Sequence, residues 1–438
     1  MSTDYVMGSL LGWLDKSTCN FMAVKTMRQE LDEVGFKRLR QNECWDLVPG
    51  GKYYVTKNGS AIFAFIIGKG KVGDHGFRII SAHSDSPCFK LKPNCEIYGE
   101  GGVVKLNVEK YGGGILYTWF DRPLSISGRV ALKGEDWLHP AERTVDLKVP
   151  VATIPHLAIH FNRQVNEGNN LSVQKDMLPV MGYFTKDEIA EQRSHGGIVR
   201  ILVARELGVA PEDIIDYELC LYPAEPAAIV GVNGEYFQSA RIDDLSMAYA
   251  GLQAMLDEHR EDAQATRVLA IFDNEETGSG TKQGAASPVL RDIMERICDK
   301  LGDGKETIYR AIANSFMISA DDAHAWHPNY NEKYDPTNHP VMGGGPVVKI
   351  NANCKYMTDS RASAIFKELC RKADVECQYF VNHSDVAGGS TLGNISSGQF
   401  DLEGVDVGNP IWAMHSARET GAVTDQVAMV KVMREFFK

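Results

Sequence analysis

The sequence predicts an α/β fold in which a mostly parallel sheet is flanked by helices and interrupted by an inserted β-rich domain. From about residue 240, helical segments alternate with short apolar strands. From 96 to 150, apolar and polar residues alternate in VVKLNV, LSISGRVAL and TVDLKV, with Gly-rich turns such as YGGG between these runs. A length of 438 residues also exceeds what one hydrophobic core usually serves, so two domains are expected.

The elements before and inside the insertion follow from residue spacing. Residues 5–35 have helical spacing, and strands are expected at 53–56 and 61–67. GFRIISAH is predicted to be a buried strand that ends at His83 and leads into a loop. Inside the insertion, residues 185–208 are predicted to be helical before LCLYPAEPAAIVGV returns to strand character.

After the insertion, the predicted helices are 244–259, 287–301, 305–313, 359–373, 389–397 and 423–437. The strands that alternate with them are TRVLAIFD, SFMISAD, PVVKI, ECQYF and GVDVG. We therefore expect one discontinuous domain of residues 1–95 and 235–438, with 96–234 as the insertion. In sheets of this kind, functional groups gather at the loops beyond the carboxyl ends of the strands.

Composition narrows the class of protein. The net charge is −12 and the chain has no basic stripe, so no nucleic-acid partner is expected. The N-terminal residues do not have the pattern of a signal peptide, and no run of about 18 apolar residues exists, so no membrane association is expected. The nine cysteines form no Cys-x-x-Cys pair, which indicates reduced thiols and a cytoplasmic location.

Polar side chains gather at the ends of five predicted strands or in the loops beside them. They are His83 and Asp85 in SAHSDSP, Asp243 and Asp244 in SARIDD, Glu275 and Glu276 in FDNEETG, Asp321, Asp322 and His324 in ISADDAH, and His415 in AMHSARE. Each cluster alone has an ordinary explanation, such as a structural histidine, a solvated turn or a helix N-terminus that favours negative charge. Five such clusters at strand-to-loop junctions instead predict a metal site of imidazole and carboxylate ligands, which suits zinc, cobalt or manganese.

The number of these groups fits a dinuclear hydrolase. Such a site needs one bridging carboxylate, about two further protein ligands per metal, and one free carboxylate as general base for a water that bridges the metals. Adjacent Glu275 and Glu276 can divide the roles of base and ligand. Asp85, two residues after His83, is well placed to orient the imidazole ring.

Seven longer motifs run in order along nearly the whole chain. They are SAHSDSPCFKLKP (81–93), YGGGILYTWFDRPLSISGRV (111–130), IPHLAIHFNRQVN (154–166), SARIDDL (239–245), FDNEETGSGT (272–281), SADDAHAWHPNY (319–330) and AMHSARE (413–419). Together they resemble the aspartyl aminopeptidase family of zinc metallopeptidases. The resemblance implies a zinc-exopeptidase-like catalytic domain and an inserted domain that serves as dimerisation element and lid.

The resemblance also implies a role for each polar residue. It places two divalent metal ions in each chain, expected to be Zn²⁺, with Co²⁺ or Mn²⁺ as alternatives. The implied ligands are His83 and Glu276 or Asp321 on separate metals, Asp243 as the bridge, and His415 completing the second metal. Glu275 is the implied general base, and Asp85 supports His83. Asp244, which follows the bridging residue, is expected to point elsewhere.

A substrate pocket is implied around Lys349 and Tyr356, which match substrate-contacting positions of the family. A cation there favours an acidic first residue. The alternative for Lys349 is an exposed lysine at the end of a strand. Asp385 is expected either to bind the α-ammonium group of the substrate or to cap a helix that begins near Gly389.

Assembly is the last implication of the resemblance. In the family, the insertion mediates a dimer contact, and the second histidine of HLAIH, here His160, reaches the active site of a neighbouring subunit. The residues alone predict that HLAIH is a strand with one buried and one exposed histidine. Family members resemble one another in forming a tetrahedral dodecamer, here expected to be built from dimers, whose shell admits only peptides.

The predicted function is therefore that of a metal-dependent aminopeptidase that favours Asp or Glu at the N-terminus of peptides. An aminopeptidase of neutral or basic preference is an alternative, and so is a dinuclear metal deacylase or carboxypeptidase with the same ligand types. The non-enzyme alternative is a catalytically silent assembly or cargo protein. The adjacent Glu275 and Glu276 argue against that alternative, because a silent protein has no need of both.

Overall fold

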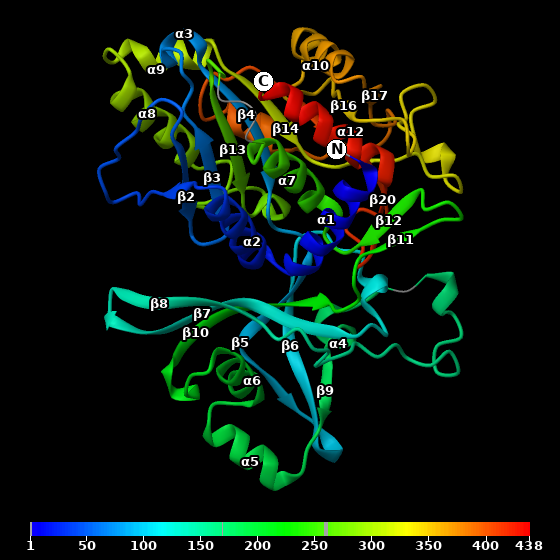
Figure 1. The fold of residues 1–438 in the computed structure, drawn as a ribbon. Helices are drawn as coiled ribbons and strands as arrows, with labels where there is room; N and C mark the ends of the chain where they lie inside the picture. The colour runs from blue at the N-terminus through cyan, green and yellow to red at the C-terminus, as the bar shows by residue number, and fades with distance from the viewer. Residues whose placement is uncertain (1, 169, 258–261) are drawn as a thin grey trace. The chain divides into compact units, whose positions relative to one another are not determined.

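The computed structural model of the chain describes residues 2–168, 170–257 and 262–438 and divides into two compact units (Figure 1). The sheet unit comprises Met1–Asp85, Ala227–Met414 and Glu419–Lys438, and the inserted unit comprises Ser86–Pro226 and His415–Arg418. The inserted unit thus begins before residue 96, because strand β5 (Cys88–Tyr98) pairs within its sheet.

A nine-stranded mixed sheet forms the centre of the sheet unit. Its strands, in spatial order, are β1 (Lys37–Arg38), β2 (Lys52–Lys57), β3 (Ala61–Ile66), β13 (Thr266–Phe272), β4 (Phe77–His83), β14 (Phe316–Ala320), β18 (Gly404–Gly408), β16 (Val347–Lys349) and β17 (Gln378–Phe380). Neighbouring strands from β13 to β18 run parallel, whereas β3 and β16 join this group antiparallel. The predicted α/β fold is confirmed, and the carboxyl ends of the four central strands meet at one edge.

Helices cover both faces of this sheet. They are α1 (Thr3–Lys16), α2 (Asn20–Glu33), α3 (Val72–His75), α7 (Ile242–Met255), α8 (Val289–Leu301), α9 (Glu306–Ala313), α10 (Ser360–Lys372), α11 (Leu392–Ser397) and α12 (Val423–Phe436). Neighbouring residues of β4 point to opposite faces: Ile80 joins a core with α1, α2, α7, α10 and α12, and Ile79 joins a core with α8, α9 and α11.

The helix expected over residues 5–35 is two helices, because the backbone is extended at Cys19 (φ −156°, ψ 174°). The side chain of Asn20, the first residue of α2, donates to the Asp273 carboxylate at 3.0 Å. Ser17 and Thr18 precede the break, and such residues favour helix ends over interiors. The break at Cys19 is therefore accompanied by the contact between Asn20 and Asp273, and helical spacing alone does not reveal it.

A second sheet of the same unit has the order β11 (Ala228–Val230), β12 (Tyr236–Ser239), β20 (Glu419–Ala422), β19 (Pro410–Trp412) and β15 (Ala323–His324). Strand β12 precedes α7, and strand β15 follows β14. Because both strands belong to this sheet, it connects these two parts of the chain. Among the helices in the described parts of the chain, none combines the length and apolar content needed to cross a bilayer.

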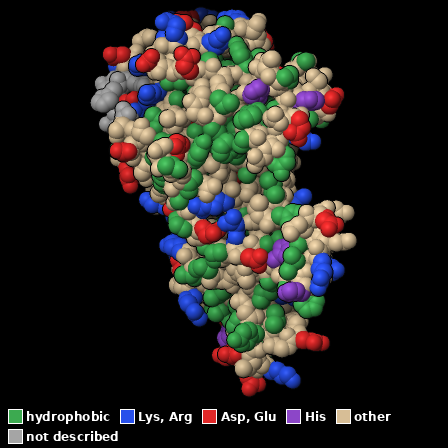
Figure 2. All heavy atoms as spheres, turned by 90° about the vertical axis from the view of Figure 1, so that its right-hand side faces the viewer, with side chains coloured by type: hydrophobic (Ala, Val, Ile, Leu, Met, Phe, Trp, Pro, Cys, Tyr) green, Lys and Arg blue, Asp and Glu red, His purple; other side chains and the backbone are tan. Residues whose placement is uncertain are grey.

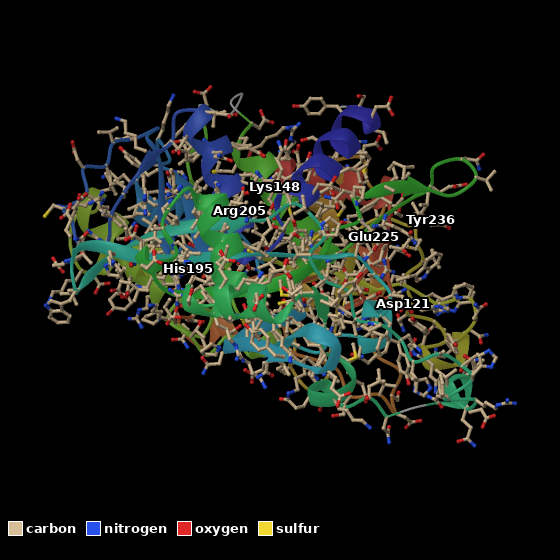
Figure 3. All side chains as sticks on the ribbon, turned by 90° about the horizontal axis from the view of Figure 1, so that it is seen from below. Asp121, Lys148, His195, Arg205, Glu225 and Tyr236 are labelled. Atoms are coloured by element: carbon tan, nitrogen blue, oxygen red, sulfur yellow. The ribbon has the colours of Figure 1, made fainter. Side chains whose placement is uncertain are left out.

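The inserted unit is built on an antiparallel sheet. Its order is β8 (His139–Asp146), β7 (Leu124–Asp136), β10 (Ile214–Pro223), β5, β6 (Val103–Tyr111) and β9 (Val180–Tyr183). Helices α4 (Val173–Asp176), α5 (Lys186–Ser194) and α6 (Ile198–Leu207) accompany it. Figure 3 labels His195 at the end of α5 and Arg205 in the last turn of α6.

Candidate functional site

His83 ends the central strand β4, and its side chain is buried. Ring atom Nδ1 lies 3.0 Å from the backbone carbonyl oxygen of Asp85 and 3.4 Å from its carboxylate Oδ1. Ring atom Nε2 lies 3.6 Å from Oδ1 of Asp243. A ring that donates from Nδ1 keeps the Nε2 lone pair for a metal, and this is the usual arrangement of a histidine ligand.

Asp85 joins the loop after β4 to the loop after β13. Its Oδ1 accepts from the backbone N–H of Glu275 at 3.1 Å, and its Oδ2 accepts from that of Glu276 at 3.2 Å. One carboxylate therefore holds both glutamates of the 3-10 turn Glu275–Thr277 while it faces the ring of His83. This position suits the supporting role that was expected for Asp85.

Asp243 and Asp244 lie at the start of α7, and both side chains are buried. The backbone N–H of Asp243 donates to Oε2 of Glu419 at 3.1 Å. Oδ2 of Asp244 accepts from the backbone N–H of His83 at 2.9 Å. The expectation that Asp244 points elsewhere is therefore wrong, because its carboxylate faces the same strand end as Asp243.

The pair Asp321–Asp322 follows β14. Oδ1 of Asp321 accepts from Nζ of Lys349 at 3.2 Å. Oδ2 of Asp322 accepts from the hydroxyl of Ser246 at 2.7 Å. Among the described residues, Oδ1 of Asp322 and Oδ1 of Asp244 are buried oxygens without a hydrogen-bond partner. Buried oxygens of this kind are expected where a cation binds.

Within the described residues of the sheet unit, these loops form two overlapping groups of atoms that could bind a metal. One ligand atom from each of His83, Asp243, Asp244 and Asp321 lies within 4.8 Å of the others. His83 also forms such a group with Glu275 and Glu276. Nitrogen and carboxylate oxygen are ligands that zinc accepts, so the residues present fit a zinc site.

The charges of this cluster are unbalanced. Burial, together with the nearby charge of Asp321, raises the pKa of Glu275 to about 8. Burial raises the pKa of Glu276 and of Asp244 well above the usual range, and neighbouring aspartates add to both effects. Burial lowers the pKa of His83, but Asp244 and Asp243 outweigh it and hold the pKa well above its usual value. Carboxylates this crowded ionise together only when a cation neutralises them.

Comparison with known proteins agrees with this chemistry. Residues 13–437 match the family model described as aminopeptidase I zinc metalloprotease, M18. A relative from Clostridium novyi, named probable M18 family aminopeptidase 2, is 46% identical over 428 residues, which cover 98% of this chain and 97% of the relative. The chain belongs to the M18 family of aminopeptidases. It is a metal-dependent aminopeptidase, which sets aside the deacylase, carboxypeptidase and silent-protein alternatives.

Solved structures of M18 proteins share the fold. An Ape4 chain, from a complex of Ape4 and Nbr1, matches with a TM-score of 0.95 and 34% identity over 99% of this chain and 86% of that chain. A chain of the mApe1 dodecamer of S. cerevisiae matches with a TM-score of 0.86 and 27% identity over 99% of this chain and 96% of that chain. The expected membership in a zinc aminopeptidase family is confirmed.

The AMHSARE motif of this M18 chain is divided between the two units. Glu419 begins β20 in the sheet unit, is buried, and accepts from the backbone N–H of Asp243. His415 belongs to the short segment grouped with the inserted unit, where its Nδ1 lies 3.3 Å from the carbonyl oxygen of Gly113. Its role as a metal ligand stays a prediction.

Lys349 ends β16 with only 3% of its surface exposed, so the alternative of an exposed lysine is wrong. Its Nζ also lies 5.8 Å from the ring centroid of Tyr356. Asp385 lies in a loop with a side chain that is 92% exposed. Helix α11 begins only at Leu392, with Thr391 at its N-cap, so the suggestion that Asp385 caps this helix is also wrong.

HLAIH does not form the strand that its residues suggested; it lies in a turn and irregular chain. The backbone N–H of His156 donates to Oδ1 of Asp121, labelled in Figure 3, at 2.9 Å, and its ring packs edge-on at 4.5 Å from that of Phe120. His160 is exposed in the turn. His156 therefore has a structural position, whereas His160 faces solvent in the single chain.

Residue patterns did not indicate the role of two buried acids near the M18 site, Glu419 and Asp406. Glu419 is the last residue of the AMHSARE motif, which does not itself indicate what the residue contacts. Asp406 is buried in β18, where Oδ2 accepts from the backbone N–H of Met357 at 2.6 Å and Oδ1 accepts from the Thr391 hydroxyl at 2.7 Å. An aspartate inside the apolar strand GVDVG was the signal that could have revealed it.

The raised pKa of Glu275 predicts how the metal-free chain responds to pH. Unfolded Glu275 releases its proton near its ordinary pKa of 4.5, whereas the folded chain keeps the proton until about pH 8. Because the folded state binds more protons in this window, the free energy of unfolding falls as pH rises through it. Thermal unfolding of chelator-treated protein between pH 5 and 8 measures the effect.

Glu275→Gln is the control, because glutamine does not titrate and the pH dependence of stability becomes shallower. Excess zinc is also expected to reduce the pH dependence, since a dication favours the ionised carboxylates. An unchanged slope in Glu275→Gln would show that other groups cause it.

Proposed function

We propose that this M18 aminopeptidase removes the N-terminal residue of peptides with two zinc ions. The proposed ligands are His83, Asp243 as the bridge, Glu276, Asp321 and His415. The observation that carries the proposal is the buried group formed by His83 with Asp243 and Asp321, beside the half-buried Glu275. The chemistry that zinc supplies in such sites is a lowered pKa of water and a polarised carbonyl oxygen.

Glu275 is proposed as the general base. Its backbone is held by Asp85, and burial, together with the charge of neighbouring acids, raises the pKa of its carboxyl group to about 8 in the metal-free chain. An ionised carboxylate at this position can accept a proton from water. In the proposed reaction, an Oε atom of Glu275 takes a proton from the attacking water and then gives it to the leaving nitrogen of the peptide. Glu276, held by the other oxygen of Asp85, is the neighbouring ligand.

Asp244 supports this site in the proposal without being a required ligand. Its Oδ2 holds the backbone N–H of His83, and this contact fixes the end of β4 against α7. Glu419 fixes Asp243 in the same way through its backbone N–H. Groups that hold ligands typically change metal affinity by 10- to 100-fold when they are lost.

Glu275→Gln tests the role of the base. Glutamine keeps the size of the side chain but cannot take the proton, so kcat is expected to fall by about 10² or more. Zinc content, measured by atomic emission, is expected to stay near that of the wild type. Glu276→Gln is the matched control, which is expected to lose zinc. Near-normal turnover of Glu275→Gln, or loss of its zinc, would contradict the assignment.

Lys349 supports a preference for Asp or Glu at the N-terminus. Burial lowers the pKa of Lys349, but Asp321 and Tyr356 outweigh it and raise the pKa above the usual value, so the ammonium group stays charged. Asp321 balances the charge of Lys349, and it would do so less fully if it also held a metal. An acidic substrate side chain restores the balance, which a neutral or basic one does not.

Lys349→Leu tests this preference. We expect activity on Asp- and Glu-substrates to fall at least 10-fold, while activity on Leu-substrates stays equal or improves, because the leucine removes the cation. A panel of chromogenic aminoacyl substrates measures kcat/KM for each residue. Zinc content is measured in parallel because Lys349 contacts Asp321.

Lys333→Leu provides the control, since Lys333 is an exposed lysine of the same unit. The preference is refuted if the wild-type enzyme already favours leucyl or lysyl substrates.

A homo-oligomer, a tetrahedral dodecamer built from dimers, is proposed as the working assembly. A similar chain forms the mApe1 dodecamer. The loop that carries His160 exposes Leu157 (57%), Ile159 (53%) and Phe161 (81%), which is unusual for a loop in contact with water only. Apolar side chains also appear at several places on the face that Figure 2 shows. We further propose a cytoplasmic location, since all nine cysteines are free thiols.

In this assembly, His160 is proposed to reach the active site of a neighbouring subunit and to donate a hydrogen bond to the oxyanion. His160→Ala is therefore expected to lose about 10²–10³ in kcat. When the dead variants Glu275→Gln and His160→Ala are dissociated and reassembled together, some pockets combine an intact Glu275 with an intact His160 from another chain, and activity returns.

The matched control replaces His160→Ala by the double variant Glu275→Gln/His160→Ala, which offers no intact base in any pocket. Native mass spectrometry verifies that mixed oligomers form. If they form and activity does not exceed the sum of the separate variants, His160 does not act between subunits.

A further inference from the structure

Two cysteines lie where helix α10 packs against the edge strand β17. Ser363, Lys367 and Cys370 are spaced four and three residues apart, so they share one face of α10. The Ser363 hydroxyl lies 3.2 Å from that of Tyr379, and Nζ of Lys367 lies 5.5 Å from the Tyr379 ring centroid. This face of α10 therefore lies along β17.

Cys377 directly precedes β17, the strand that α10 contacts. It precedes Tyr379 by two residues, so both side chains point to the same side of the extended chain. The chain returns tightly from α10, since the backbone N–H of Val375 donates to the carbonyl oxygen of Cys370 at 3.0 Å and Asp374 has φ +54°. Cys377 consequently packs against the core that contains Cys370, and each thiol shifts the pKa of the other.

We propose that Cys370 and Cys377 form a redox-active dithiol that a peroxide oxidises to an intramolecular disulfide. The pair includes no proposed metal ligand, so this site is independent of the proposed catalytic chemistry. The disulfide would join α10 to the residue that immediately precedes β17. Strand β17 pairs with β16, which carries Lys349 opposite Phe380.

The two thiols have distinct environments. Cys377 is half-buried, and the thiol of Cys370, helped by Lys367, lowers the pKa of Cys377 to about 7. Cys370 is 1% exposed, and its contact with Cys377, followed by burial, raises its pKa. A peroxide in solution reaches the half-buried Cys377 but not the buried Cys370, so Cys377 is the attacking sulfur and Cys370 is the resolving one.

The reaction balances with one peroxide. The Cys377 thiolate attacks an oxygen of hydrogen peroxide, the O–O bond breaks, and sulfenic acid and hydroxide form. The Cys370 sulfur then attacks the Cys377 sulfur and displaces the hydroxyl group, which leaves as water with the thiol proton. The two sulfurs lose two electrons in total, and the peroxide ends as two molecules of water.

The test treats the zinc-loaded full chain with stoichiometric hydrogen peroxide, blocks remaining thiols with iodoacetamide, and digests it with trypsin without reductant. Arg371 and Lys372 lie between the two cysteines, so trypsin separates residues 368–371 from 373–418, each with one cysteine. We expect these two peptides to appear joined, lighter by two hydrogens than their sum, and to separate on reduction. The exposed Cys44 and Cys354 are the internal comparison and are expected to stay mostly alkylated.

Variants separate the two steps. Cys370→Ser is expected to stop at a Cys377 sulfenic acid, which a 1,3-dione reagent traps, whereas Cys377→Ser is expected to leave Cys370 reduced. Cys354→Ser is the control and keeps the link. The wild-type digest decides the matter even if the buried Cys370→Ser does not fold. The proposal is overturned if peroxide oxidises Cys44 or Cys354 before Cys377, or if Cys377 is oxidised without a link to Cys370.

Discussion

The structure depends most on the negative charge concentrated at the carboxyl edge of the central sheet. Asp243, Asp244 and Asp321 converge on His83, and burial raises the pKa of Asp244 and of the neighbouring Glu275. A buried cluster of carboxylates is stable only when positive charges or hydrogen bonds balance its negative charge. Lys349 provides one fixed positive charge through Asp321, and a divalent cation provides the rest. The fold thus concentrates negative charge at this site, and a bound metal ion would balance it.

Backbone amides are the second means by which the fold manages this charge. Asp85 accepts from the amides of Glu275 and Glu276, Asp244 accepts from that of His83, and Glu419 accepts from that of Asp243. Each contact joins two segments that are far apart in sequence. The same hydrogen bonds that stabilise individual carboxylates therefore also hold the loops at the strand ends against one another.

Residue patterns predicted the helices and strands well, but they did not predict which distant residues these segments contact. The position of His83 followed from GFRIISAH, because an apolar strand that ends in a histidine and an aspartate is a local signal. The break at Cys19 and the turn at HLAIH are accompanied by contacts with distant residues, Asp273 in one case and Asp121 in the other, which residue spacing does not reveal. For the same reason Asp244 was expected to point elsewhere: its partner, the amide of His83, lies 161 residues away in sequence.

Charge balance also ties substrate choice to metal binding. Asp321 is a candidate ligand and at the same time the partner of the buried Lys349. Any cation that engages Asp321 weakens its hold on Lys349, since one carboxylate cannot fully neutralise both. The ammonium group then needs another anion, and Asp406 is already engaged by Met357 and Thr391. In the proposed function, an anionic group of the substrate is that partner, so the proposed acidic preference depends on metal loading rather than on a separate pocket.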